Sequence, residues 1–359
     1  MRRLRICIIG SSRFPIREPF AGGLEAHTHA LARHLSARGH EVTLFAAPGS
    51  DPALGAEELA VEQMQPVDGE RADTSIPPHW WMQEHHAYQG LMLALMREGH
   101  GRFDVLHNNS VHHLPVAMAD VVPVPMVTTL HTPPTPWLRS ALAHVSPRAA
   151  FVAVSRCTAA AWAGTVDSRA LLNGVDTQRW VPGPGGGPAV WSGRLVPEKA
   201  PHLAIDAARR AGVPLLLAGP VLDTEYVDRE VRPRLGDDVR HVGHLDQQAL
   251  CALVGRASVA VVTPDWEEPY GLVAAEAMAC GTPVAALDRG AMREVVVEGG
   301  GVIADPCDPA ALAEAMVAAA RLDRDRVRRI AEDHCSLERM VDAYEVVYAQ
   351  TLERPLEVA

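Results

Sequence analysis

The chain has 359 residues, enough for two ordinary hydrophobic cores, and its 48% hydrophobic and 21% charged residues are typical of a soluble globular protein. Its formal net charge is −11 and it has no run of basic residues, which argues against nucleic acid or an anionic membrane as the main partner. The six scattered cysteines form no Cys-x-x-Cys pair, and the apolar run before Gly10 spans only about four residues, so we expect a cytoplasmic protein without a signal peptide or membrane span.

The first half of the chain predicts a parallel α/β sheet. An isoleucine-rich strand stops at Gly10, and Gly22-Gly23 precede a helix over residues 24–38 whose apolar residues recur at helical spacing. Strand, glycine-rich turn, helix and strand form a right-handed βαβ unit. Further apolar strands are predicted at 40–47, 103–109, 124–131 and 149–155. Near-continuous apolar strands between helices indicate a sheet that is covered on both faces.

The same pattern begins again after a stretch of glycine and proline at residues 181–188. Strands are predicted at 189–193, 213–219, 237–245, 258–264 and 282–288, and helices at 197–212, 246–257, 271–281 and within 308–353. We therefore predict two doubly wound, Rossmann-like domains, 1–180 and 189–338, which face each other across a cleft and are joined by a hinge at 181–188.

Histidines are concentrated in the first half: 13 of the 17 precede residue 145. They show no convincing helical His-x-x-x-His with a third ligand. The adjacent pairs His85-His86 and His112-His113 point in different directions on a helix or strand. The sequence analysis therefore predicts no metal site.

A single lysine, Lys199, stands among 33 basic residues, in the stretch WSGRLVPEKA. Arg194 and Lys199 flank a predicted strand-to-helix turn, where a guanidinium and an ammonium could bind phosphate oxygens. The alternatives are a chance lysine in an arginine-rich chain and a solvated helix start with an Arg194–Glu198 pair.

Two carboxylates lie seven residues apart in WEEPYGLVAAEAMACGTPV. Glu268 precedes a helix that opens at Gly271-Leu272, and Glu276 lies about two turns along it, so both could contact one extended ligand. The alternative is a capping acid and a surface glutamate. Similarly, Gly22-Gly23 could let the backbone approach an anion at a helix N-terminus, or could simply form a turn.

Glu268-x7-Glu276 resembles the signature of the retaining glycosyltransferases of family 4, which have the GT-B fold. Other motifs agree in order along nearly the whole chain: Gly22-Gly23, TLHTPP, VSRCT, LLNGVDTQRW and SGRLVPEKA. Ala200 stands where the family usually has glycine, Arg289 occupies another common glycine position, and the prolines after His131 replace residues that are sometimes acidic.

The resemblance implies that Arg194 and Lys199 bind the diphosphate of a nucleotide-sugar and stabilise the leaving group. It further implies that Glu276 binds the ribose and that Glu268 holds sugar hydroxyls. His131 would lie beside the sugar and β-phosphate. The remaining donor contacts that it implies come from Gly22, Gly23, His244, Gly271, Leu272 and Val273. A terminal helix at about 339–359 would pack back on the first domain, as in GT-B relatives.

The sequence thus predicts a metal-independent, cofactor-free retaining glycosyltransferase. The donor is a nucleoside-diphosphate sugar, with UDP favoured over GDP, and the acceptor is a soluble small molecule or saccharide. The alternatives are a reversible enzyme of the sucrose-synthase or phosphorylase type, a non-catalytic sugar-nucleotide-binding protein, and a hydrolytic epimerase, for which no acid–base pair is evident.

Overall fold

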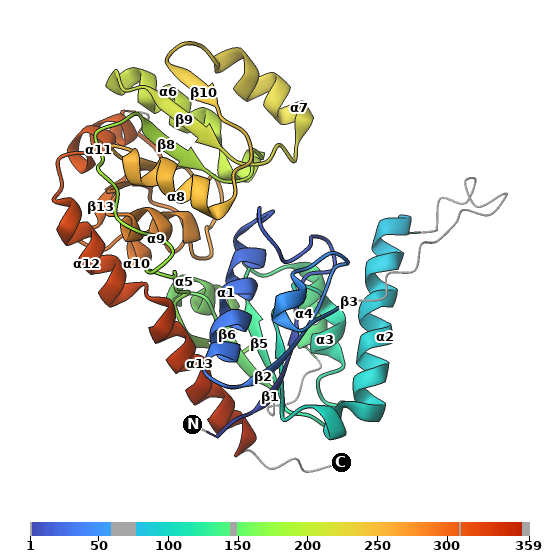
Figure 1. Ribbon diagram of the computed structural model, residues 1–359. Helices are drawn as coiled ribbons and strands as arrows, with labels where there is room; N and C mark the ends of the chain where they lie inside the picture. The colour runs from blue at the N-terminus through green and yellow to red at the C-terminus, as the bar shows by residue number, and fades with distance from the viewer. Residues whose placement is uncertain (1, 59–76, 144–148, 309, 354–359) are drawn as a thin grey trace, which may run out of the picture.

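A computed structural model describes residues 2–58, 77–143, 149–308 and 310–353, and it shows two parallel sheets with helices on both faces (Figure 1). In the described part of the chain no helix combines the length and apolar character needed to cross a membrane.

The N-terminal sheet has seven strands in the order β3-β2-β1-β4-β5-β6-β7. Its strands are β1 (Arg5–Ile9), β2 (Glu41–Ala46), β3 (Ala56–Glu58), β4 (Val105–Asn108), β5 (Met126–Leu130), β6 (Ala150–Ala153) and β7 (Arg169–Ala170). The helices are α1 (Gly23–Ala37), α2 (His79–Arg102), α3 (His113–Ala117), α4 (Pro136–Leu142) and α5 (Arg156–Trp162). Every pairing is parallel, and the central strands β1, β4 and β5 are almost wholly buried. Most of their residues are apolar, and the buried polar ones are hydrogen-bonded, as in His107 of β4 with Thr129 of β5 (2.8 Å).

The C-terminal sheet has six parallel strands in the order β10-β9-β8-β11-β12-β13. They are β8 (Ala189–Ser192), β9 (Leu215–Ala218), β10 (Val239–His241), β11 (Ala260–Val262), β12 (Val284–Leu287) and β13 (Gly301–Ala304). The main helices are α6 (Pro201–Ala211), α8 (Gln247–Arg256), α9 (Leu272–Ala279), α11 (Ala311–Ala319) and α12 (Arg324–His334); the short α7 (Thr224–Tyr226) and α10 (Met292–Val295) lie between strands.

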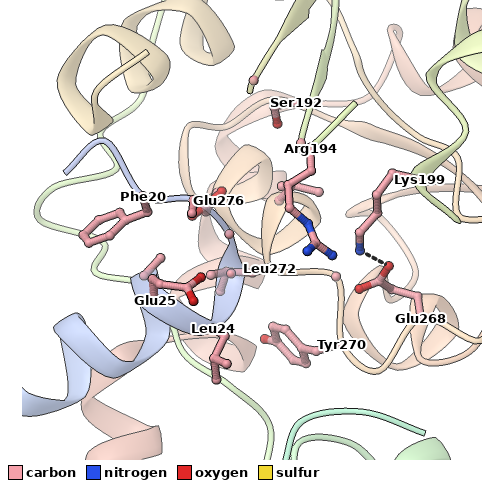
Figure 2. A pocket seen from close by; sticks show the side chains of 18 of the residues that line it. Phe20, Leu24, Glu25, Ser192, Arg194, Lys199, Glu268, Tyr270, Leu272 and Glu276 are labelled. Carbon is pink, nitrogen blue, oxygen red and sulfur yellow. Dashed lines mark hydrogen bonds and ion pairs between the residues drawn. The ribbon is translucent and has the colours of Figure 1, made fainter. Parts of the chain in front are cut away.

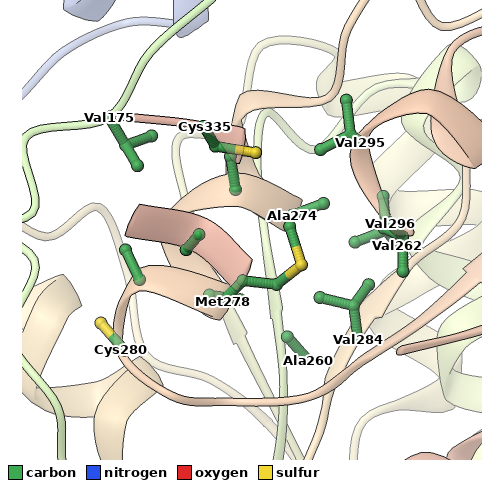
Figure 3. Close-up of a cluster of buried hydrophobic side chains, with 14 of the residues drawn as sticks. Val175, Ala260, Val262, Ala274, Met278, Cys280, Val284, Val295, Val296 and Cys335 are labelled. Carbon is green, nitrogen blue, oxygen red and sulfur yellow. The ribbon is translucent and has the colours of Figure 1, made fainter. Parts of the chain in front are cut away.

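Small side chains allow α9 to lie close to its sheet. Ala274 and Met278 pack against Val262 of β11 and Val284 of β12 in a fully apolar cluster (Figure 3). This close packing fixes the helix that carries Glu276.

The prediction of one helix over 197–212 is wrong in one respect. A short 3₁₀ turn, Pro197–Lys199, is separated from α6 by Ala200, which adopts the left-handed conformation (φ 44°). Pro201 explains the break, because a proline disfavours the helical conformation of the residue before it. The left-handed conformation of residue 200 also explains why the family that the sequence resembles usually has glycine at this position, because glycine adopts this conformation without strain.

The last helix, α13 (Leu337–Leu352), follows the C-terminal sheet in sequence but packs on the N-terminal half (Figure 1). The Tyr344 hydroxyl lies 3.0 Å from Thr129 Oγ1, and the Tyr348 hydroxyl lies 2.7 Å from His107 Nδ1. The sequence analysis placed this helix at about 339–359, and residues 354–359 lie outside the described part of the chain.

The connecting segment 181–188 is hydrogen-bonded to the C-terminal half. The Gly185 amide donates to the Gly255 carbonyl (3.0 Å), and the guanidinium of Arg324 donates to the carbonyls of Gly183 and Gly255. Gly183 packs so closely that an added Cβ would lie 2.4 Å from the Gly255 backbone. Motion of the domains about this segment remains a prediction.

Candidate active site

One cavity of about 380 Å³ receives residues from both halves of the molecule. Its lining includes all eleven residues that the sequence analysis selected: Gly22, Gly23, His131, Arg194, Lys199, His244, Glu268, Gly271, Leu272, Val273 and Glu276. The structure therefore brings these residues together, while the chemical role of each remains a prediction.

Sheet topology explains why these residues meet. Strand order reverses between β1 and β4 in the N-terminal sheet and between β8 and β11 in the C-terminal sheet. In open α/β sheets such a reversal leaves a crevice beyond the carboxyl ends of the strands, where ligands bind. Ser11 follows β1 and Arg194 follows β8, and both line the cavity.

Lys199 forms an ion pair inside the cavity. Its Nζ lies 2.5 Å from Glu268 Oε2 (Figure 2). Trp266 Nε1 donates to the same oxygen at 2.9 Å. The ammonium also lies 5.2 Å from the centroid of the Trp266 ring, within cation–π range. Glu268 is buried and Lys199 is partly buried, so the ammonium is positioned before any ligand arrives.

Arg194 reaches from the C-terminal half toward the N-terminal half. Its guanidinium lies 3.5 Å from Glu198, the pair that the sequence analysis named as the alternative to phosphate binding, and Arg194 lines the cavity as well. A Cβ added to Gly22 would lie 3.7 Å from Arg194 Cδ and 3.3 Å from Glu25 Oε2. The Gly22 backbone therefore lies within van der Waals reach of this arginine from the other half, and the tighter contact is to Glu25 of its own helix.

Glu276 projects from α9 into the cavity and is only 9% exposed. Burial, and secondarily the charge of Cys251, raises the pKa of its carboxyl to about 8. In the empty cavity the carboxyl is therefore largely neutral at pH 7 and able to donate as well as accept hydrogen bonds.

The beginning of α9 depends on a glycine. Gly271 has a φ of 88°, and a Cβ at this position would lie 2.0 Å from Met292 Cε. This conformation turns the chain into α9, so Leu272 and Val273 occupy the first turn of the helix and line the cavity. Backbone amides at a helix N-terminus favour anions.

The N-terminal wall of the cavity carries His131. Its Nε2 lies 2.8 Å from Asn109 Oδ1, and because a carbonyl oxygen accepts, Nε2 carries the proton and Nδ1 keeps a lone pair. Burial, assisted by His27 and His107, holds the pKa of His131 well below its ordinary value. His131 is therefore a neutral hydrogen-bonding group at physiological pH.

Two family models match most of the chain: "Glycosyltransferase Family 4" over residues 21–179 and "Glycosyl transferases group 1" over residues 187–333. A glycogen synthase of Mycobacterium tuberculosis is 32% identical over 342 residues, which cover 82% of this chain and 81% of that protein. The chain belongs to the group 1 glycosyltransferases of family 4. A D-inositol 3-phosphate glycosyltransferase of Geodermatophilus obscurus is 28% identical over 97% of this chain and 90% of its own.

Solved structures confirm the GT-B fold of this glycosyltransferase. Sucrose-phosphate synthase from Thermosynechococcus elongatus matches with a TM-score of 0.75 and 20% identity, covering 96% of this chain and 98% of its own. HepE from Anabaena in complex with UDP-glucose also matches with a TM-score of 0.75, at 18% identity, and the match covers 97% of this chain and all of that one.

Direct contacts hold the two halves of the glycosyltransferase around the cavity. In the VSRCT motif, Thr158 Oγ1 donates to the carbonyl of Pro269, the residue after Glu268 (3.2 Å). The Glu294 carboxylate accepts the amides of Arg156 (2.8 Å) and Cys157 (2.6 Å) at the start of α5. These motif residues therefore join the halves across the cavity.

His244 also contacts the opposite half, because its Nε2 lies 2.9 Å from the Phe20 carbonyl oxygen. Among residues 241–244, at the end of β10, only His244 lines the cavity, whereas the His241 ring lies 2.9 Å from the Gly219 carbonyl oxygen.

Among the cavity residues that sequence reasoning missed are Glu25, Asn173 and Trp266. Asn173 Oδ1 is buried and has no hydrogen-bond partner among the described residues, so it is available to a ligand. The Asn173-Gly174 motif was a signal for it. Trp266 and Glu25 were predictable only as neighbours of Glu268 and Gly22-Gly23.

Proposed function

We propose that this glycosyltransferase transfers a sugar from a UDP-sugar to a hydroxyl of a soluble small molecule or saccharide, with retention of the anomeric configuration. The observation that carries the proposal is the convergence of Arg194 and Lys199 from one half with Gly22 and His131 from the other on one cavity.

The two cations would bind the diphosphate and stabilise the charge that develops as the sugar–phosphate bond breaks. Lys199 would exchange Glu268 for a phosphate oxygen, and Arg194 would bind a second oxygen as a bidentate donor. These residues supply the positive charge that a divalent ion supplies elsewhere, so we infer that donor turnover needs no added metal.

Glu268 would hold sugar hydroxyls rather than attack the sugar. Its Oε2 accepts from both Lys199 and Trp266, which positions the carboxylate in the cavity. We infer attack by the acceptor on the face that the phosphate leaves, with a phosphate oxygen taking the acceptor proton. His131 would accept a sugar hydroxyl through Nδ1.

The choice of UDP is supported by the HepE structures, which contain UDP, UDP-glucose or UDP with glucose. A starch synthase IV of similar fold is bound to ADP, so the preference of this enzyme for one nucleotide base must be measured. A thermal-shift comparison of UDP, GDP and ADP should show the largest increase in Tm with UDP, because a ligand of the native state stabilises by mass action.

Product analysis tests the reaction itself. With donor and a panel of saccharide and polyol acceptors in EDTA, we expect UDP and a glycoside of retained configuration in equal amounts. Free sugar and nucleotide without a glycoside would indicate hydrolysis, and binding without turnover would indicate a sugar-nucleotide-binding protein. Formation of UDP-sugar from UDP and glycoside at comparable rates would favour the reversible synthase, and loss of activity in EDTA would contradict metal independence.

A soluble acceptor is supported by the low positive charge of α4, because relatives in the family that act on lipid acceptors often carry a basic amphipathic surface helix in the N-terminal domain. Helix α4 carries one arginine, Arg139, within its seven residues, whereas Arg148 lies outside the described part of the chain. We expect no stable binding to anionic liposomes at physiological salt. Tight sedimentation with such liposomes would instead indicate a lipid acceptor.

A further inference from the structure

Three histidines that are separate in sequence meet beside the active-site cavity. His85 lies in α2, His112 precedes α3 and His113 begins it, and one ring nitrogen from each lies within 4.8 Å of the others. The sequence analysis treated His112-His113 as divergent, but their rings stack with centroids 4.4 Å apart. The chain turns from extended to helical between these two residues, which changes the direction of the second side chain.

The nitrogen atoms of this three-histidine cluster suit a metal ion. His85 Nδ1 is buried without a hydrogen-bond partner among the described residues, so its lone pair is unused. Burial first, and charge repulsion from neighbouring histidines second, lowers the pKa of all three rings, to about 3 for His112. Neutral imidazoles are the protonation state that ligates metals.

The surroundings shield the cluster on one side. The Trp81 indole stacks on His85 with a 17° interplanar angle and centroids 5.1 Å apart, and lies parallel to His113 at 6.5 Å. The carboxylate of Glu84, which acts electrostatically on His113, is engaged by Arg13 at 2.9 Å. The cluster therefore consists of neutral nitrogen donors, the set preferred by zinc, copper and nickel.

We propose that His85, His112 and His113 bind one late first-row divalent cation, physiologically Zn²⁺, which links α2 to the start of α3. A tetrahedral zinc site with bonds of about 2.0–2.1 Å needs nitrogens about 3.3 Å apart, so small side-chain rotations from the present spacing suffice. Three protein ligands leave the fourth position for water. The proposed metal site adjoins the donor cavity, because Val111, the residue before His112, lines that cavity. None of the three histidines is among the residues that line it. The metal site does not depend on the proposed donor chemistry.

His112 has a second task. Its Nδ1 accepts the Leu114 amide at 3.2 Å and so caps α3. Ligation through Nε2 requires the tautomer that carries its proton on Nδ1. Because Nδ1 then no longer accepts the Leu114 amide, ligation weakens the cap, which makes His112 the weakest of the three ligands. A His112→Asn variant retains a cap acceptor and removes the ligand.

The test is titration of the chelator-treated full-length protein with Zn²⁺ and Co²⁺. We expect one equivalent of metal, a rise in Tm, and cobalt absorption of a four- or five-coordinate site without a thiolate charge-transfer band. His85→Gln and His113→Gln should each abolish stoichiometric binding, and His112→Asn should weaken it. His100→Ala, an exposed histidine near the other end of α2, should bind metal as wild type does.

Circular dichroism of each variant separates loss of a ligand from loss of the fold. Absence of binding to the wild type at neutral pH would overturn the proposal, and so would binding that survives the His85→Gln/His113→Gln double variant. If the wild type binds no zinc while Trp81→Ala raises the KM of a saccharide acceptor, the cluster is an acceptor platform instead. Turnover of the double variant with and without EDTA isolates any metal requirement of the donor cavity.

Discussion

The two walls of the cavity meet the substrate with different chemistry. The C-terminal wall presents ionisable groups that the fold has already paired, as in Lys199–Glu268 and Arg194–Glu198. Of the predicted site residues, the N-terminal wall contributes the backbone at Gly22-Gly23 and the neutral imidazole of His131, beside the ionisable side chains of Arg13 and Glu25.

Because of this difference, we expect the two walls to contribute differently to the binding free energy of the nucleotide and to turnover. Charged groups in a partly desolvated site interact strongly with a diphosphate in both the ground state and the transition state. A neutral hydrogen bond contributes less, and glycine contributes through close approach. The C-terminal wall should therefore determine nucleotide affinity, and both walls should determine turnover.

The largest effect is expected for Lys199→Ala. Removing the ammonium should lower turnover by roughly 10²-fold or more, the range observed when one preorganised donor to a developing negative charge is removed. Lys199→Arg should restore little, because the planar fork does not replace a compact ammonium. Steady-state kinetics at saturating donor are the measurement, with His100→Ala, an exposed residue outside the cavity, as the control. A nearly normal rate in the alanine variant would show that Lys199 has no role in turnover and is a chance lysine in an arginine-rich chain.

On the other wall, His131→Ala should lower turnover by about tenfold, the value of one neutral hydrogen bond of about 1.4 kcal/mol in the transition state. The same assay checks this, and His100→Ala serves as control. A loss as large as that of Lys199→Ala would show that His131 acts as a charged or proton-transferring group and would break the contrast between the walls.

The Glu276→Gln variant tests the C-terminal wall through the pH dependence of the protein's stability. Because burial raises the folded-state pKa of Glu276 from 4.5 to about 8, the folded protein holds a proton that the unfolded chain releases in this interval. The stability that this proton confers is present at low pH and is lost as the pH rises from about 4.5 to 8. Denaturant unfolding at pH 5, 6.5 and 8 should show the glutamine variant gaining on the wild type as pH rises. Parallel pH profiles would exclude a raised pKa.

The smallest effect concerns domain closure. Donor binding should reduce the radius of gyration in solution scattering by more than UMP does, because only a donor contacts both walls. A radius that does not change with saturating donor would indicate that the halves stay in the arrangement seen here, held by contacts such as Thr158–Pro269.

Much of the cavity was predictable because its residues lie in short motifs at strand ends. The Arg194–Lys199 turn and the Glu268–Glu276 spacing each place two groups within a few residues, and parallel sheets bring strand ends to one edge. The two-domain α/β fold followed similarly from apolar strands alternating with helices.

Features that depend on packing between distant segments were not predictable. The three-histidine cluster joins residues 85 and 112, which only the contact of α2 with α3 brings together. Likewise, the glycine- and proline-rich composition of 181–188 predicted a hinge but gave no sign of the close hydrogen-bonded packing of this segment on α8. The composition of a segment indicates which backbone conformations it can adopt, but it does not indicate which part of the protein the segment packs against.

The most direct test of the division between the walls is calorimetric titration of UDP into Lys199→Ala and His131→Ala. Lys199→Ala should bind UDP at least about tenfold more weakly than wild type, since it lacks a charge-assisted contact to the diphosphate. His131→Ala should bind UDP with nearly the wild-type Kd, although its turnover is lowered. Equal losses of affinity in the two variants, or a loss confined to His131→Ala, would contradict the account.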